Sequence, residues 1–235
     1  NIYLQYRPIR QLTFKTNNAV ETINNDGRRY WSPETSQGDA TLQVSRSSNL
    51  QLTTSNTATY NDLFDDIHNV RVLLGQEAQK YTSDYLYSYA PDVNPDIPYV
   101  QTAPQSGVEA EQGYSATTLL SFFSMLDYNY DEKYYLQASL RSDGSSLFGS
   151  ENRWGTFYSV GASWNIHREN FMDNLDFVNL LKLRASYGLN GNNNIEAYRA
   201  YGVYASTQYN GTTGMRPSRP SNPFLGKERY LESWS

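Results

Sequence analysis

Three segments in the second half of the chain alternate between apolar and polar residues. They cover residues 134–141, 157–166 and 180–189. In the first of them, Leu136 and Leu140 fall on one side, whereas Gln137 and Arg141 fall on the other. A period of two is the mark of β-strands whose two faces meet different surroundings.

The apolar sides of these three segments define one predicted surface. It carries Leu136, Leu140, Val160, Trp164, Leu183 and Ala185. We expect this surface to face membrane lipid, because the hydrocarbon layer requires the apolar side of a spanning strand to point outward. Gln137, Ser163 and Arg184 would then point to the opposite face, into the lumen of a barrel.

The same reasoning predicts about nine strands along the chain. Three connections are expected to be long loops, Asn24–Asp39, Ala90–Gly113 and Asn190–Lys227, and a fourth loop of medium length is expected at Ser142–Asn152. Others are expected to be short: Pro8–Arg10 with a turn at Pro8 and Ile9, Asn61–Ile67, Asp131–Lys133, and the link His167–Asn179. In this last link, Phe171, Leu175 and Val178 have near-helical spacing and predict a short helical turn.

Short and long connections alternate along the chain, so an up-and-down sheet collects the short turns at one end and the long loops at the other. This asymmetry is typical of outer-membrane barrels. Aromatic residues beside the short turns would form an interfacial girdle: Tyr128, Tyr130, Tyr134, Tyr135 and Trp164. The alternative is a soluble β-sandwich whose aromatic residues fill an ordinary core.

Composition narrows the class of protein. The 235 residues contain no cysteine and carry a net charge of −5, which argues against a thiolate metal site and against a nucleic-acid surface. Mean hydropathy is −0.69, and no run approaches the roughly 18 apolar residues of a membrane helix. Mean hydropathy does not detect the strands of a membrane barrel, because lipid-facing and lumen-facing residues alternate along them. Tyrosine, with 21 residues, suits surfaces where apolar surroundings meet water.

Several stretches resemble a known family, the SusC/RagA-type TonB-dependent outer-membrane transporters. They read LLSFFSMLDYNYDEKYYLQASLRSDGSSLFGSENRWGTFYSVGASWNI, NLLKLRASYGLNGNNNI, YNGTTGMRP, NPFLG, HNVRVLLGQE and RPIRQLTFKT. The chain departs from the family pattern in the apolar run Phe123–Leu126 and in the segment KERYLESW.

The resemblance implies an all-β, transmembrane, antiparallel up-and-down β-barrel of about 22 strands. Residues 1–235 would supply about nine of these strands, as a mid-barrel portion without the plug domain, and this portion alone should not close. It further implies import of glycans or peptides across the outer membrane of a Gram-negative bacterium. The implied partners are TonB, which supplies energy, and a SusD-like surface lipoprotein, which acts as a lid.

Catalytic chemistry finds little support in the sequence. His68 and His167 lie far apart at turns, and an Asp-Gly turn explains Asp143 without invoking a glycosidase pair with Glu151. We therefore expect no enzyme activity, no cofactor and no metal. The lumen-facing cations Arg141, Lys182 and Arg184 would either pair with the plug or the barrel wall, which is the favoured interpretation, or line the path of the cargo.

Tyrosines in and beside the long loops are the candidate contacts for a ligand or a lid. They are Tyr85, Tyr87, Tyr89, Tyr198, Tyr201, Tyr204 and Tyr209. Their rings can stack on sugar faces and their hydroxyls can form hydrogen bonds. The function is therefore predicted to be energised import, with a non-transporting β-sandwich module that binds glycans at the surface as the alternative.

Overall fold

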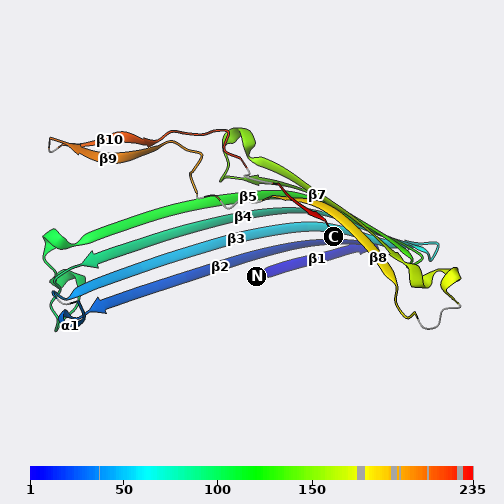
Figure 1. The fold of residues 1–235 in the computed structure, drawn as a ribbon, viewed down its shortest axis with the longest axis horizontal. Coiled ribbons are helices and arrows are strands. Elements are labelled where there is room, and N and C mark those ends of the chain that lie inside the picture. The colour runs from blue at the N-terminus through cyan, green and yellow to red at the C-terminus, as the bar shows by residue number, and fades with distance from the viewer. Residues whose placement is uncertain are drawn as a thin grey trace. The chain divides into compact units, whose positions relative to one another are not determined.

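A computed structural model describes residues 1–36, 38–173, 178–191, 195, 197–210, 212–226 and 230–234, the last range by its backbone alone. The main element is a nine-stranded sheet with the strand order β1-β2-β3-β4-β5-β6-β7-β8-β11 (Figure 1). Its strands are β1 (Ile2–Ile9), β2 (Leu12–Trp31), β3 (Thr41–Phe64), β4 (His68–Ala90), β5 (Glu109–Tyr130), β6 (Tyr134–Ser145), β7 (Trp154–Asn165), β8 (Lys182–Gly191) and β11 (Tyr230–Trp234).

This topology confirms the predicted all-β, antiparallel, up-and-down arrangement, because β1 to β8 follow one another in the chain and are neighbours in the sheet, with β11 next to β8. The strand predicted near Arg229 is β11, which pairs with β8; Arg229 itself lies outside the described residues. Within the described part of the chain, β1 and β11 are the edges of an unclosed sheet, as expected. The other sheet has only two strands, so the described strands do not form the two comparable sheets of a sandwich.

Contacts divide the chain into two compact units. The first comprises Asn1–Asn18, Thr53–Gln79 and Thr118–Ser235, and the second comprises Ala19–Leu52 and Lys80–Thr117. Membrane-spanning strands need about 9–11 residues. Strands β6, β7 and β8 have 12, 12 and 10 residues, whereas β2 to β5 have between 20 and 24. The longer strands therefore exceed what a bilayer requires.

All four predicted loops are partly strand, so their predicted bounds were wrong; β5, for example, begins at Glu109, inside the loop predicted to reach Gly113. β2 continues through Asn24 and the Asn-Asp-Gly turn signal as far as Trp31. Here, pairing with the neighbouring strand overrides the local turn propensity. A Cβ on Gly27 would lie 2.5 Å from the Ser45 Oγ, so a larger residue would displace that hydroxyl. In the same way, β6 continues to Ser145, inside the loop predicted from Ser142.

Short turns lie close to where the sequence placed them. The turn predicted at Pro8 and Ile9 is wrong, because both residues belong to β1. A bulge between Tyr6 and Ile9 accommodates the proline in the strand. The β3–β4 turn places Asp65 and Asp66 at φ values of 51° and 60°. The β5–β6 turn at Asp131–Lys133 is confirmed, and it has Asp131 and Glu132 at 49° and 52°. Aspartate tolerates this left-handed backbone better than most residues other than glycine.

The predicted loop Asn190–Lys227 contains a hairpin that the alternation analysis missed. Its strands are β9 (Val203–Tyr209) and β10 (Thr212–Arg219), which pair from Tyr209 and Thr212 outward. Asn210 has a φ of 50° at the turn. The Asn-Gly pair at 210–211 is a strong hairpin signal in the sequence and could have revealed it.

In the part of the chain that the structure describes, helical structure is confined to short turns. They are α1 (Pro33–Ser36), η1 (Val100–Thr102), η2 (Gln105–Gly107), η3 (Ser150–Asn152), η4 (Ile166–Arg168) and η5 (Asn170–Met172). The last two confirm helical turns within the link after β7, although the predicted contribution of Leu175 lies outside the described residues. Among the residues described, no helix is both long enough and apolar enough to cross a membrane.

A small apolar core lies in the second unit. Its buried members are Ala40, Leu42, Ala90, Val93 and Ala103. The Val93 amide donates to the Ala40 carbonyl over 2.9 Å, so part of the connection between β4 and β5 packs onto the strand ends. This long connection is consequently an ordered structure with its own core.

Candidate functional site

The register of β6, β7 and β8 places the predicted apolar residues on one face. Leu136 pairs with Ala162, which pairs with Ala185, and Trp164 pairs with Leu183. Direct partners in an antiparallel ladder project to the same side of the sheet, and alternation adds Leu140 and Val160. Leu140 is 52% exposed and Leu183 is 61% exposed, so this face has no apolar cover within the described chain.

The apolar surface also occurs on the N-terminal strands of the first unit. A hollow of about 470 Å³ is lined mainly by apolar side chains from β1 to β4, including Leu4, Tyr6, Phe14, Ala58 and Leu74. In the ladder, Tyr6 pairs with Phe14 and Leu4 pairs with Thr16. Apolar side chains on one side of each strand are what a lipid-facing wall requires.

A row of aromatic rings crosses the strands beside the short turns. His68 lies 5.1 Å from Tyr130, Tyr130 lies 6.1 Å from Tyr134, and Tyr134 lies 6.2 Å from Trp164, all between ring centroids. The His68 Nδ1 and the Tyr128 hydroxyl are 2.8 Å apart. The sequence identified these four aromatic residues but missed His68.

Tyr135 does not belong to this row, which corrects the prediction. It pairs with Ser163, which pairs with Arg184, and therefore projects to the polar face. Its ring instead receives the Lys182 ammonium group, with the nitrogen 4.8 Å from the centroid. Tyr135 follows Tyr134 directly along β6, so its ring points to the opposite face of the sheet. Its position near a turn was therefore not enough to predict the face on which the ring lies.

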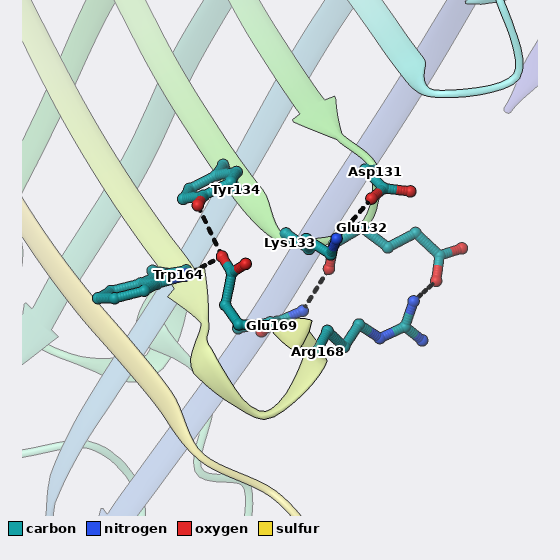
Figure 2. A network of polar contacts seen from close by, with 8 residues as sticks. Asp131, Glu132, Lys133, Tyr134, Trp164, Arg168 and Glu169 are labelled. Carbon is teal, nitrogen blue, oxygen red and sulfur yellow. Dashed lines mark hydrogen bonds and ion pairs between the residues drawn. The ribbon is translucent and has the colours of Figure 1, made fainter. Parts of the chain in front are cut away.

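Glu169 fastens the link after β7 to the aromatic row (Figure 2). Its Oε1 accepts hydrogen bonds from the Tyr134 hydroxyl at 2.6 Å and from the Trp164 Nε1 at 2.8 Å. Nearby, Arg168 forms an ion pair with Glu132, and the Lys133 Nζ lies 2.9 Å from the Asp131 carboxylate. The tight β5–β6 turn and the link after β7 are thus joined through side chains as well as backbone.

These contacts shift the pKa values of Glu169 and Lys133. Hydrogen bonds from Tyr134, and then from Trp164, hold the pKa of the Glu169 carboxyl below its ordinary value. The hydrogen bond to Asp131 raises the pKa of Lys133. A lowered carboxyl pKa means that the folded state prefers the ionised form.

We expect the network to make heat stability depend on acid pH. Because the folded pKa of Glu169 is depressed, its contribution is present above the unfolded pKa of about 4.3 and is lost as pH falls through the folded value. The Glu169→Gln variant of the full-length protein should therefore lose less stability than the unaltered protein between neutral and acid pH. Melting temperatures across that range provide the measurement. The exposed Glu151→Gln variant is the control, and equal pH slopes for both variants would contradict the expectation.

The polar face carries a saturated network around Arg141. Its Nε donates to Asp143 over 2.7 Å and its Nη2 donates to the buried Ser121 hydroxyl over 2.9 Å. Glu77 lies 3.8 Å from the same guanidinium group, which also sits 5.5 Å from the centroid of the Phe123 ring. Of the two pairings considered for Arg141, the structure shows contacts with the wall of the sheet.

Aromatic rings cover glycines on neighbouring strands. The Phe123 ring occupies the space where a Cβ on Gly75 would lie, and the Phe157 ring does the same over Gly191. The Tyr85 ring lies against Gly113 in the second unit. Aromatic cover of a strand glycine restores packing that the missing side chain cannot supply.

The geometry is therefore that of a wall with one apolar face, one polar face and an aromatic row beside tight turns. No protein-family model matches the chain. The TonB-dependent receptor P26 of Formosa agariphila is 32% identical over 240 residues, covering 96% of the chain and 24% of the relative. The TonB-dependent receptor SusC of Bacteroides thetaiotaomicron is 36% identical over 104 residues, covering 44% of the chain and 10% of SusC.

A solved structure agrees over nearly the whole chain. The RagAB peptide importer in its open-open state matches with a TM-score of 0.86 and 26% identity, covering 99% of the chain and 26% of the importer chain. The chain belongs to the SusC/RagA-type TonB-dependent receptors. It spans about a quarter of the length of P26 and of the RagAB chain.

TonB-dependent receptors of this type lie in the outer membrane of Gram-negative bacteria and are transporters, not enzymes. The side chains weighed for catalysis have structural partners. His68 belongs to the aromatic row, the Nδ1 of His167 lies 3.1 Å from the Leu181 carbonyl, and Asp143 binds Arg141. The described residues hold no group of three or more His, Cys, Asp or Glu side chains placed to bind a metal ion.

The candidate tyrosines fall into two sets in this receptor. Tyr85, Tyr87 and Tyr89 alternate along the distal part of β4, where the Tyr85 hydroxyl donates to Glu111 over 2.6 Å. The second set lies in and before the β9–β10 hairpin, which carries Tyr204 and Tyr209.

The members of the second set differ in exposure. Tyr198 and Tyr201 pack with their centroids 6.3 Å apart. Tyr204 is 64% exposed and Tyr209 is 86% exposed. This exposure makes both rings available for contact with a ligand or a lid.

Sequence reasoning missed a further aromatic residue in the β4–β5 connection of the receptor. Tyr99 is 57% exposed, and the Arg28 guanidinium group lies 5.4 Å from the centroid of its ring. Arg28 also donates to the Pro98 carbonyl over 2.5 Å. The arginine on β2 thus fixes the tip of the connection, a long-range contact that no local pattern signals.

Proposed function

We propose that residues 1–235 form a section of the barrel wall of an outer-membrane importer for oligosaccharides or oligopeptides. The observation that carries the proposal is the two-faced sheet, whose apolar face, with Leu136, Leu140, Val160, Trp164, Leu183 and Ala185, faces lipid. The polar face lines the route of the transported molecule. Similarity to a solved peptide importer supports a peptide as cargo, and similarity to SusC leaves a glycan as the other candidate.

A SusD-like lipoprotein covers the long-loop end in this proposal, and TonB supplies energy through the part of the receptor outside these residues. The match to a two-component importer supports the lid. The cargo is captured by tyrosine rings of the long-loop end, where stacking and hydrogen bonds supply the binding energy.

The proposal is tested by uptake of a labelled nutrient in three strains: the parent, one lacking the full-length gene, and one lacking TonB. Import requires both components, so uptake should be lost in both deletion strains. Undiminished uptake in both strains, or hydrolysis of the nutrient by the purified protein, would overturn the proposal.

Capture should weaken when loop tyrosines lose their rings. We expect Tyr201→Ala in the full-length receptor to weaken nutrient binding about threefold to tenfold, the value of one aromatic contact. Tyr201→Phe keeps the ring and should retain most of the affinity. Binding isotherms on purified receptor give the measurement, and the melting temperature should stay unchanged. Equal affinities for the alanine variant and the unaltered receptor would remove Tyr201 from the capture site.

A further inference from the structure

The polar face of the first unit is hollowed near the short turns. One hollow of about 630 Å³ lies against β1 to β6, and a second of about 350 Å³ lies against β6, β7 and β8. Tyr135 and Gln137 line both, so the two hollows meet along β6. The polar wall is therefore continuous from β1 to β8 at this level.

Cations dominate this wall. The two hollows are lined by Arg7, Arg10, Arg71, Lys182 and Arg184. Asp127 is the only described carboxylate among the lining residues, and it already accepts a hydrogen bond from Gln137 over 3.0 Å. The rest of the lining consists mainly of Asn, Gln, Ser and Thr.

None of these five cations forms an ion pair with a carboxylate of the described chain. Four other described cations do form such pairs: Arg46, Lys133, Arg141 and Arg168. What distinguishes the five cations of the wall is that they share one polar surface, in a chain whose net charge is −5. Charges of one sign gathered in a hollow raise the local concentration of ions of the opposite sign.

The chemistry of these cations indicates which kind of anion they would bind. Arginine presents a planar fork that matches a carboxylate, and the neighbouring amides and hydroxyls add neutral hydrogen-bond partners. Arg7, Arg71 and Arg184 are exposed, and an exposed ion pair contributes only weakly to binding. A passage needs contacts of this weak, repeated kind, because the cargo must enter and also leave.

We propose that this basic wall, formed by Arg7, Arg10, Arg71, Lys182 and Arg184, makes the importer selective for cargo that carries carboxylate groups. The inference rests on the proposed function and deepens it by naming the charge class of the cargo. The carboxylates belong to acidic side chains of an oligopeptide or to uronic acids of an oligosaccharide. In both cases, the same guanidinium groups receive them during passage.

The test uses the full-length receptor in cells with its partners present. Two matched pairs of labelled probes are compared: a glutamate-containing hexapeptide against its glutamine counterpart, and oligogalacturonate against oligogalactose. The uptake of each probe is measured for the unaltered receptor and for Arg71→Gln/Arg184→Gln. Arg46→Gln, which removes a cation already paired with Asp26, is the matched control.

In the unaltered receptor, the acidic member of one pair should be taken up faster, and that pair identifies the source of the carboxylates. In Arg71→Gln/Arg184→Gln, its uptake should fall about threefold to tenfold, the value of two exposed ion pairs, while uptake of the neutral probe stays within twofold. The control variant should behave as the unaltered receptor.

Equal loss for acidic and neutral probes, or a lowered melting temperature of the double variant, would overturn the inference, because the cations would then hold the receptor's own polypeptide. A preference for the neutral probes in the unaltered receptor would overturn it as well. Failure of the proposed function has a different result: none of the probes enters, and deletion of the gene changes nothing.

Discussion

Val160→Arg should destabilise the full-length receptor by about 2–4 kcal/mol if the site lies near the bilayer midplane. Val160 pairs with Ala138 and Tyr187 on the apolar face and is 45% exposed in the structure. An arginine there would place a guanidinium group in hydrocarbon with no partner. Two measurements give the loss of stability. One is the temperature at which the band of the folded, heat-modifiable receptor disappears on gels, and the other is urea titration in detergent or lipid.

Gln137→Arg is the matched control, because it places the same side chain on the polar face of β6. The Gln137 Nε2 already donates to Asp127 over 3.0 Å, so a guanidinium group at this position finds a carboxylate. We expect this variant to assemble and to melt near the unaltered receptor. Normal assembly and unchanged stability of Val160→Arg would show that this face does not meet lipid.

Gly75→Ala should lower stability by about 1–3 kcal/mol, the usual effect of forcing extra atoms into a packed site. The Phe123 ring fills the position that the new methyl group would take. Phe123 also lies beside the Arg141 guanidinium group, so displacement of the ring disturbs the network on the polar face. Melting temperature and the urea midpoint of the full-length receptor provide the measurements.

A double-mutant cycle isolates the cause. Phe123→Leu removes the ring, and Gly75→Ala on that background should be nearly neutral because space has been freed. Contacting residues commonly show interaction energies of about 0.5–3 kcal/mol in such cycles. Strictly additive effects would mean that the alanine acts through backbone conformation and not through the ring.

The strands with one apolar and one polar face were predictable from the sequence. Periodicity alone placed Leu136, Val160 and Leu183 on one face, and the ladder confirms the arrangement because a slip of one residue would invert every side chain. Where both faces are polar, this signal disappears. The continuation of β2 beyond Asn24 was missed for that reason, since its residues form a strand through pairing and not through alternation.

The candidate site also has a part that was predictable from the sequence and a part that was not. Aromatic residues near turns were visible in the sequence, but Tyr135 was assigned to the wrong face because a residue's parity in the ladder matters more than its distance from the turn. The Glu169 bridge depends on how the link after β7 folds back on Tyr134 and Trp164. Arg71 on β4 and Arg184 on β8 line neighbouring hollows of one sheet, and no local pattern could place them on the same surface before the strand order was known.

The tight connections at the short-turn end bear on the order of folding. β5 and β6 are joined by Asp131–Lys133 alone, whereas β8 reaches β11 only after the segment that contains the β9–β10 hairpin. Closing the longer connection costs about 2 kcal/mol more in chain entropy. The β5–β6 hairpin therefore has low contact order and is expected to form early, whereas the β8–β11 ladder is expected to form late. Until then β8 carries an unpaired edge, and this is the stage at which an assembly chaperone would protect the chain most.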